Sequence, residues 1–146
     1  MAFSIELLVE PAPELEPGVR ACLGAIKIGD FEERFVASLM YWQPEDYRRH
    51  WEEAITRIVE GADRSCLITS IVDPASSEFL FWWPMYRAEK TVLLQNQILF
   101  FDQLSSRFDP SNPFIHVRER PSINVDGEPI SEWSASIEEM SQFLLS

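Results

Sequence analysis

One amphipathic segment limits what this chain can fold into more than any other feature. Between Pro44 and Gly61 the sequence is PEDYRRHWEEAITRIVEG. Proline is favoured in the first turn of a helix, and glycine is favoured just after the last turn because it adopts positive φ without strain. Bulky apolar residues recur at helical spacing along the segment: Tyr47, Trp51, Ala54, Ile55, Ile58. The sequence therefore predicts one long helix, about residues 44–60, whose apolar stripe packs on another layer.

The segments around this helix predict antiparallel strands. Gly29 and Asp30 form a two-residue hairpin turn between strands expected near 20–28 and 31–39. Three more apolar segments separated by turn residues predict a meander: 65–72, 78–86 and 91–101. The middle one is almost continuously apolar, which is typical of a strand covered on both faces.

Weaker signals complete the prediction. Pro84 cannot donate to a neighbouring strand, so it marks a bulge or a loss of pairing. Residues 114–120 predict an edge strand, and a capping-box pattern at Ser136 and Glu139 predicts a short C-terminal helix. Prolines at the N-terminus predict an extended arm over residues 1–18. The expected fold is therefore α+β: a single domain, 1–146, with a mostly antiparallel sheet, the long helix packed across it and a short C-terminal helix.

The charge of the chain limits its partners. It has 24 acidic and 12 basic residues, and a formal net charge of -12. Such a field repels phosphate backbones, so we expect no direct binding of nucleic acid, whereas it attracts basic proteins. The same charge also keeps a protein soluble, and charge alone favours this role over a basic partner. The N-terminus lacks the features of a signal peptide and no long apolar run occurs, so we expect a cytoplasmic protein without a membrane segment.

Residues for catalysis are scarce. The two histidines, His50 and His116, lie in different elements without metal-ligand spacing, and His50 is expected to be a partly solvated side chain at the edge of the helix stripe. Cys22 and Cys66 lie 44 positions apart without a CxxC motif, which fits a reducing compartment but leaves one disulfide open. Paired acids such as Glu52 and Glu53 point in different directions on a helix. We therefore expect no enzyme, no metal and no cofactor.

An aromatic run with two amides beyond it leaves a second hypothesis open. Phe79, Phe81 and Trp83 are expected in the core, together with Tyr47, Trp51 and Ile58 of the helix. The alternative is a small-ligand-binding or enzymatic module, in which the 79–86 strand and Gln95/Asn96 form a pocket. If the third strand alternates, one of these two amides faces inward and needs hydrogen-bond partners.

Four motifs, in this order, carry a resemblance to a known family. They are YWxxxDY with a tryptophan four residues later (Tyr41 to Trp51), FxFxW with a later tyrosine (Phe79 to Tyr86), VxxQNxxxF (Val92 to Phe100) and ISEW (Ile130 to Trp133). The chain resembles, over about residues 28–143, the immunity proteins of bacterial contact-dependent growth inhibition (CDI) systems. Within that family it is similar to the subfamily whose partners include toxins resembling ribosomal-RNA-cleaving colicins.

The resemblance implies a function and a partner. Such a protein binds and neutralises the C-terminal toxin domain of its cognate effector, and it has no catalytic activity. A nuclease toxin must be basic to hold its substrate, so acidic residues on the hairpin and helix are the candidate contacts: Asp30, Glu32, Glu33, Glu52, Glu53. The N-terminal proline arm departs from the pattern of the family, and its role is left open.

Overall fold

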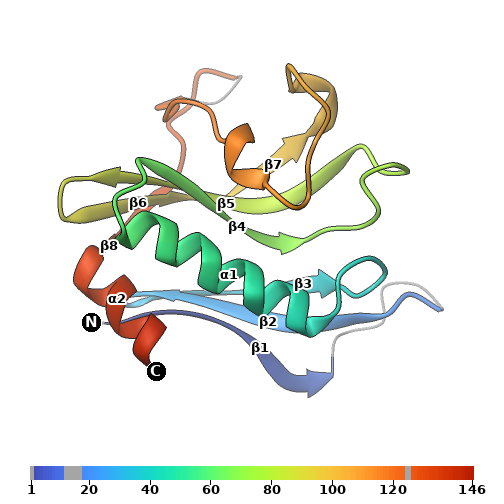
Figure 1. Cartoon of the computed structure of the whole chain (residues 1–146), viewed down its shortest axis with the longest axis horizontal. Coiled ribbons are helices and arrows are strands. Elements are labelled where there is room, and N and C mark those ends of the chain that lie inside the picture. Colours follow the sequence, from blue (N-terminus) through green and yellow to red (C-terminus); the bar gives the residue numbers. More distant parts are fainter. Residues whose placement is uncertain (1, 12–17, 124–125) are drawn as a thin grey trace.

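Two antiparallel sheets and one long helix make up the computed structural model, which describes residues 2–11, 18–123 and 126–146. The first sheet has the order β1-β2-β3, and the second contains β4, β5, β6 and β8 in that order, with β7 also paired to β5. The strands of the two sheets are β1 Phe3–Pro11, β2 Ala21–Ile28, β3 Phe31–Ser38, β4 Arg64–Ser70, β5 Phe79–Ala88, β6 Thr91–Gln95, β7 Gln97–Phe100 and β8 Glu132–Ser136. The helices of the chain are α1 Pro44–Val59, α2 Ile137–Leu145 and two short 3-10 helices, η1 Phe101–Gln103 and η2 Pro113–His116. The α+β prediction is confirmed, although the strands form two sheets, with α1 lying between their planes (Figure 1).

The predicted hairpin is present, and the described part of the N-terminal arm forms a third strand beside it. β2 and β3 pair in unbroken register from Ala21↔Ser38 to Ile28↔Phe31, and Gly29 takes the positive φ of 60° that the turn needs. Residues 3–11 of the expected extended arm form β1, which pairs with β2 and buries Phe3 and Ile5. The sheet supplies hydrogen-bond partners that the sequence alone does not reveal. The remainder of the proline segment, residues 12–17, lies outside the described residues.

The predicted meander is confirmed with one interruption. The expected strand 91–101 divides at Asn96 into β6 and β7, and both pair with β5. Pro84 lies between the β5 residues that pair with β7 and those that pair with β6, so β5 has no partner there on that edge. The expected loss of pairing at the proline is therefore confirmed. Proline has no N–H to donate, so it weakens a sheet least at a position where no strand pairs with it on one edge.

Near the C-terminus the prediction is correct for the helix and wrong for the strands. The expected edge strand 114–120 is absent, since Pro113 begins the 3-10 turn η2. β8 was not predicted, and it pairs with β6. α2 begins as expected: the backbone N–H of Glu139 donates to Ser136 Oγ at 3.0 Å, and the Glu139 carboxylate accepts from the Ser136 N–H at 3.0 Å.

Helix α1 packs along the edge of β4 and satisfies its free backbone groups. His50 Nε2 accepts a hydrogen bond from the N–H of Ile68 at 2.8 Å, and Trp51 Nε1 donates to the carbonyl of Ile68 at 2.8 Å. The hydroxyl of Tyr47 accepts from the N–H of Ile71 at 3.1 Å. An uncovered strand edge would leave these groups unpaired or open to another chain. The polar atoms on the helix stripe therefore close this edge of the five-stranded sheet.

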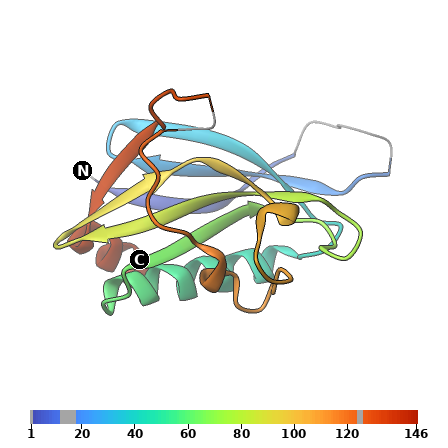
Figure 2. The same cartoon turned by 90° about the horizontal axis from the view of Figure 1, so that it is seen from above.

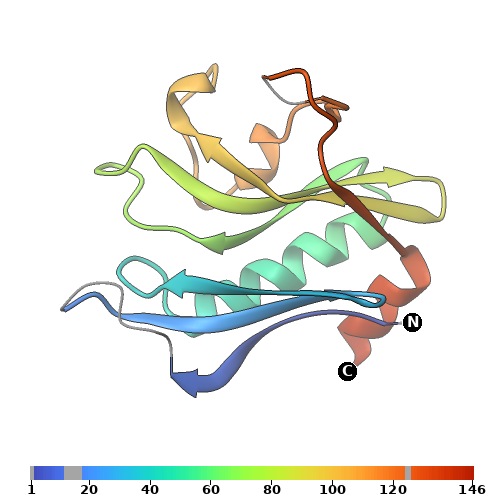
Figure 3. The same cartoon turned by 180° about the vertical axis from the view of Figure 1, so that it is seen from behind.

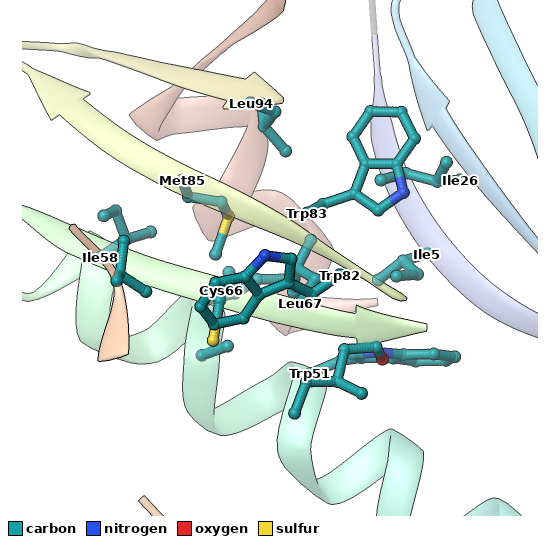
Figure 4. Close-up of a cluster of buried hydrophobic side chains, with 14 of the residues drawn as sticks. Ile5, Ile26, Trp51, Ile58, Cys66, Leu67, Trp82, Trp83, Met85 and Leu94 are labelled. Atoms are coloured by element: carbon teal, nitrogen blue, oxygen red, sulfur yellow. The ribbon is translucent and has the colours of Figure 1, made fainter. Parts of the chain in front are cut away.

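The core lies between the two sheets and against α1, and Figure 4 shows a part of it that contains Trp51, Leu67 and Trp83. Tyr47, Trp51, Ile58 and Trp83 are buried, as predicted. The prediction is wrong for Phe79 and Phe81 of β5, which are exposed.

Candidate functional site

An exposed apolar surface occupies one end of the five-stranded sheet. Four side chains share one face of β5 and β7, and each is between 42% and 46% exposed: Phe79, Phe81, Ile98, Phe100. Register places Phe79 opposite Phe100 and Phe81 opposite Ile98. The ring of Phe79 lies 5.5 Å from that of Phe81 and 6.0 Å from that of Phe100. We call these four residues the apolar patch.

Phe79 and Phe81 were expected in the core, but both are exposed in the patch. Side chains two positions apart in a strand share a face, so both lie on the same face as Trp83. Trp83 is covered by the three-stranded sheet, where its ring lies 6.3 Å from that of Phe31. β5 continues past this cover, and Phe79 and Phe81 are therefore open to solvent.

A pocket of about 380 Å³ lies between the two sheets beside the patch. We call it the intersheet pocket. It is lined by apolar residues Val19, Ala21, Phe35, Val36, Phe81 and Trp83, and by polar residues Glu33, Ser38, Thr69, Ser70 and Asn96. Phe81 belongs to both the pocket and the patch, so the two form one continuous surface. Figure 3 shows the sheet of β1, β2 and β3 below the sheet that contains β5, and residues of β3 and β5 line the pocket.

Close packing positions the floor and rim of the pocket. A Cβ atom on Gly24 would lie 2.3 Å from the ring of Phe35, so only glycine lets this ring rest against β2. The same ring meets Trp51 edge-on at 6.0 Å. On the rim, Asn96 Nδ2 donates to Glu33 Oε2 at 2.9 Å, which connects β3 to the junction of β6 and β7. The pocket therefore depends on contacts from both sheets.

The rim of this surface is acidic. Of the described residues that line the intersheet pocket, Glu33 is the one charged side chain. At the other end of the patch, Phe100 borders a second hollow with Glu78 and Asp102, and no basic residue is among the described ones that line it. Apolar surface bordered by carboxylates suits a partner that carries both apolar and cationic groups.

The five candidate acids do not form one cluster. Glu33 lines the intersheet pocket, whereas Glu52 lines a different hollow with Arg48 of α1 and Glu6 of β1. Glu53, Asp30 and Glu32 are exposed. Figure 2 shows α1 and the β2–β3 hairpin on opposite sides of the molecule. Sequence proximity grouped residues that the fold separates.

The two amides behave differently. Gln95 is buried, and its Nε2 donates to the carbonyl of Pro121 and to Glu132 Oε2, both at 2.9 Å, which confirms that one amide faces inward with partners. Arg120 binds the same carboxylate at 2.6 Å, and this hydrogen bonding lowers the pKa of Glu132. Gln95 therefore has a structural role.

The small-ligand hypothesis needed a pocket that joins the aromatic strand to both amides. Asn96 lines the intersheet pocket, but Gln95 does not. Trp82 and Tyr86 line a smaller hollow, about 210 Å³, which Gln95 does not line either. The arrangement expected for that hypothesis is therefore only partly present.

Burial shifts the pKa values of His50, Cys22 and Cys66. His50 is buried between α1 and β4, contrary to the expected partly solvated position, and desolvation lowers its pKa to about 3. Burial raises the pKa of the thiols of Cys22 and Cys66, which are both free. Within the described part of the chain, no group of three or more metal-ligating side chains could hold an ion. No described helix is both long enough and apolar enough to cross a bilayer.

Comparison with known proteins places the chain in a family. The model of the CdiI N-terminal domain matches residues 37–143. The chain belongs to the CdiI N-terminal domain family. A curated CdiI relative, the immunity protein CdiI of Enterobacter cloacae, is 29% identical over 119 residues, which cover 82% of this chain and 81% of the relative.

A solved structure extends the match to nearly the whole chain. It is described as the CdiA-CT/CdiI toxin and immunity complex from Enterobacter cloacae, with a TM-score of 0.85 and 27% identity. The match covers 98% of this chain and 96% of that one. The CdiI family model begins within β3, whereas the structural match includes the first sheet. The intersheet pocket is lined from both parts, since Val19 and Glu33 precede the matched segment and Phe81 lies within it.

The exposed apolar residues of β7 were missed at the sequence level. Ile98 and Phe100 belong to a continuous apolar run, Ile98–Phe101, that shows no alternation with polar residues. Such a run predicts burial on both faces, and only the reach of the other sheet shows which face is open.

Proposed function

We propose that this chain is an immunity protein, which binds and neutralises the C-terminal toxin domain of a CDI effector. The observation that carries the proposal is the match, over most of both chains, to an immunity protein and to a solved toxin and immunity complex. An inhibitor of this kind acts by occupying its partner, so it requires a binding surface and no catalytic groups.

The finer proposal concerns the toxin. We infer that the toxin is a basic nuclease that acts in the cytoplasm, where its substrate lies. The chain resembles immunity proteins whose partners include toxins similar to ribosomal-RNA-cleaving colicins. Support comes from the net charge of -12, because a nuclease holds phosphates with cationic residues that an acidic inhibitor attracts. In this proposal the five candidate acids contribute to the field that steers the toxin towards the inhibitor.

Co-expression tests the general proposal. The C-terminal toxin domain of the cognate CDI effector is induced in bacteria with and without this chain. We expect growth arrest without the chain, survival with it, and co-purification of the two proteins. An unrelated CDI toxin domain serves as the specificity control, and the chain should not protect against it. Continued growth arrest with the cognate toxin, when both proteins are soluble, would contradict the proposal.

A cleavage assay tests the finer proposal. The purified toxin domain is incubated with ribosomes, with naked RNA and with DNA, and equimolar inhibitor is then added. We expect cleavage of a nucleic acid that the inhibitor suppresses. A toxin that arrests growth but leaves all three substrates intact would refute the nuclease assignment without affecting the immunity function.

A further inference from the structure

We propose that the intersheet pocket and the apolar patch together form the surface on which the toxin domain docks. The occupant is a projecting apolar side chain of the toxin, flanked by a cationic side chain that pairs with Glu33. This inference rests on the proposed immunity function and names the surface that performs it.

The first support is the exposed apolar area. A monomeric protein rarely leaves large apolar side chains contiguous on its surface, and such patches bordered by polar groups mark interaction sites. Here four such residues touch or pair across β5 and β7, and Phe81 extends the surface into a pocket of about 380 Å³. Energetically dominant contacts between proteins are typically side chains that fill pockets of this kind.

The second support is charge complementarity. The carboxylate of Glu33 lies on the pocket rim, where the amide of Asn96 binds one of its oxygens. Glu78 and Asp102 border the far end of the patch. A cationic group at this rim gains a charge-assisted hydrogen bond next to apolar surface that excludes water. The partner must therefore present an apolar anchor within a basic surface.

A second copy of this chain fits the surface poorly. A two-fold interface would place the same patch on both subunits and would bring their acidic rims close together. Both copies would also carry a net charge of -12. Like charges placed in opposition weaken an interface, so a basic partner is favoured over self-association.

A matched pair of substitutions tests the docking surface. Ile98→Arg places a cation in the patch, and Ile115→Arg makes the same change at an exposed isoleucine of η2, which is 61% exposed and outside the patch. Both variants change net charge equally, so long-range steering changes equally. We expect Ile98→Arg to weaken toxin binding at least about tenfold, and Ile115→Arg to change it no more than about twofold.

A second comparison measures the contribution of the Glu33 charge to toxin binding. Glu33→Gln keeps an oxygen that can accept from Asn96 but removes the charge, and Glu52→Gln and Glu53→Gln serve as controls on α1. We expect Glu33→Gln to lower the toxin affinity more than the combined α1 changes do. Thermal melts of all variants report whether the fold is retained. If Ile98→Arg melts below the assay temperature, Ile98→Ser against Ile115→Ser replaces the first pair.

The outcomes separate the two proposals. Loss of affinity confined to the patch and Glu33 variants supports the docking surface. If the Ile98 variant and the matching Ile115 variant bind the toxin with equal affinity, the docking surface is refuted and the immunity function is unaffected. Absence of wild-type binding would refute the immunity function itself. A wild-type dimer that Ile98→Arg dissociates would assign the patch to self-association and would also overturn the proposal.

Discussion

The buried histidine of α1 should make the stability of this protein depend on pH. In the folded chain His50 accepts a hydrogen bond from Ile68, and its pKa is lowered from 6.5 to about 3 by desolvation. In the unfolded chain it regains its ordinary pKa and binds a proton below about pH 6.5. Because only the unfolded state takes up this proton, the free energy of unfolding falls as the pH drops from 6.5 towards 3.

The size of the effect follows from these two values. Between about pH 7.5 and about pH 5, protonation of the unfolded chain at this one site lowers the free energy of unfolding by about 2 kcal/mol. The result requires only that the folded pKa lies well below 5. It is a large effect for a domain whose total stability is roughly 5–15 kcal/mol.

His50→Gln isolates this contribution. The glutamine oxygen can accept the same backbone hydrogen bond but does not titrate. Urea unfolding of both proteins at the two pH values gives the difference between their pH dependences. We expect the wild type to lose about 2 kcal/mol more than the variant. His116, whose pKa is also lowered by burial, is common to both proteins and cancels.

An equal loss of stability in the two proteins would refute the reasoning. It would mean that His50 takes up its proton in the folded state as readily as in the unfolded one. Water would then have to reach the imidazole between α1 and β4.

Three further predictions follow from the packing and the charge. Trp51→Ala should lower the free energy of unfolding by roughly 3–5 kcal/mol, because the side chain is 2% exposed and binds the carbonyl of Ile68; an unchanged melting temperature would contradict its buried position. Gly24→Ala should lower the free energy of unfolding by about 1–3 kcal/mol and weaken toxin binding, because the new methyl group displaces the ring of Phe35, which lines the pocket. Chemical denaturation measures the first effect, and a binding titration measures the second. The association rate with the toxin should fall at least roughly tenfold between low salt and salt above the physiological level, in stopped-flow measurements, and a rate independent of salt would exclude electrostatic steering.

Local signals were sufficient for most of the elements. The α1 helix begins at Pro44 and Gly61 follows its end with φ 116°, because proline and glycine act on the adjacent backbone alone. The β2–β3 turn and the cap at Ser136 are equally local. β1 and β8 were missed because their strand character depends on partners distant in the sequence.

The candidate site was largely beyond prediction for the same reason. Glu33 was identified as a candidate contact from its charge, and the structure places it on the pocket rim. Nothing in the sequence distinguishes it from Glu52, which lines a different hollow. Position on a common surface depends on how two sheets stack, and charge spacing along the chain carries no information about that.

The sequence by itself determined the periodic and compositional properties of this protein: an amphipathic helix, an antiparallel meander and a strongly acidic surface. The tertiary structure decided which apolar faces are covered. Phe79 and Trp83 share one face of β5, yet Trp83 is buried and Phe79 is open, because the three-stranded sheet covers only part of that face. Periodicity specifies the face of a strand on which a side chain lies, whereas burial depends on how far a separate layer extends over it.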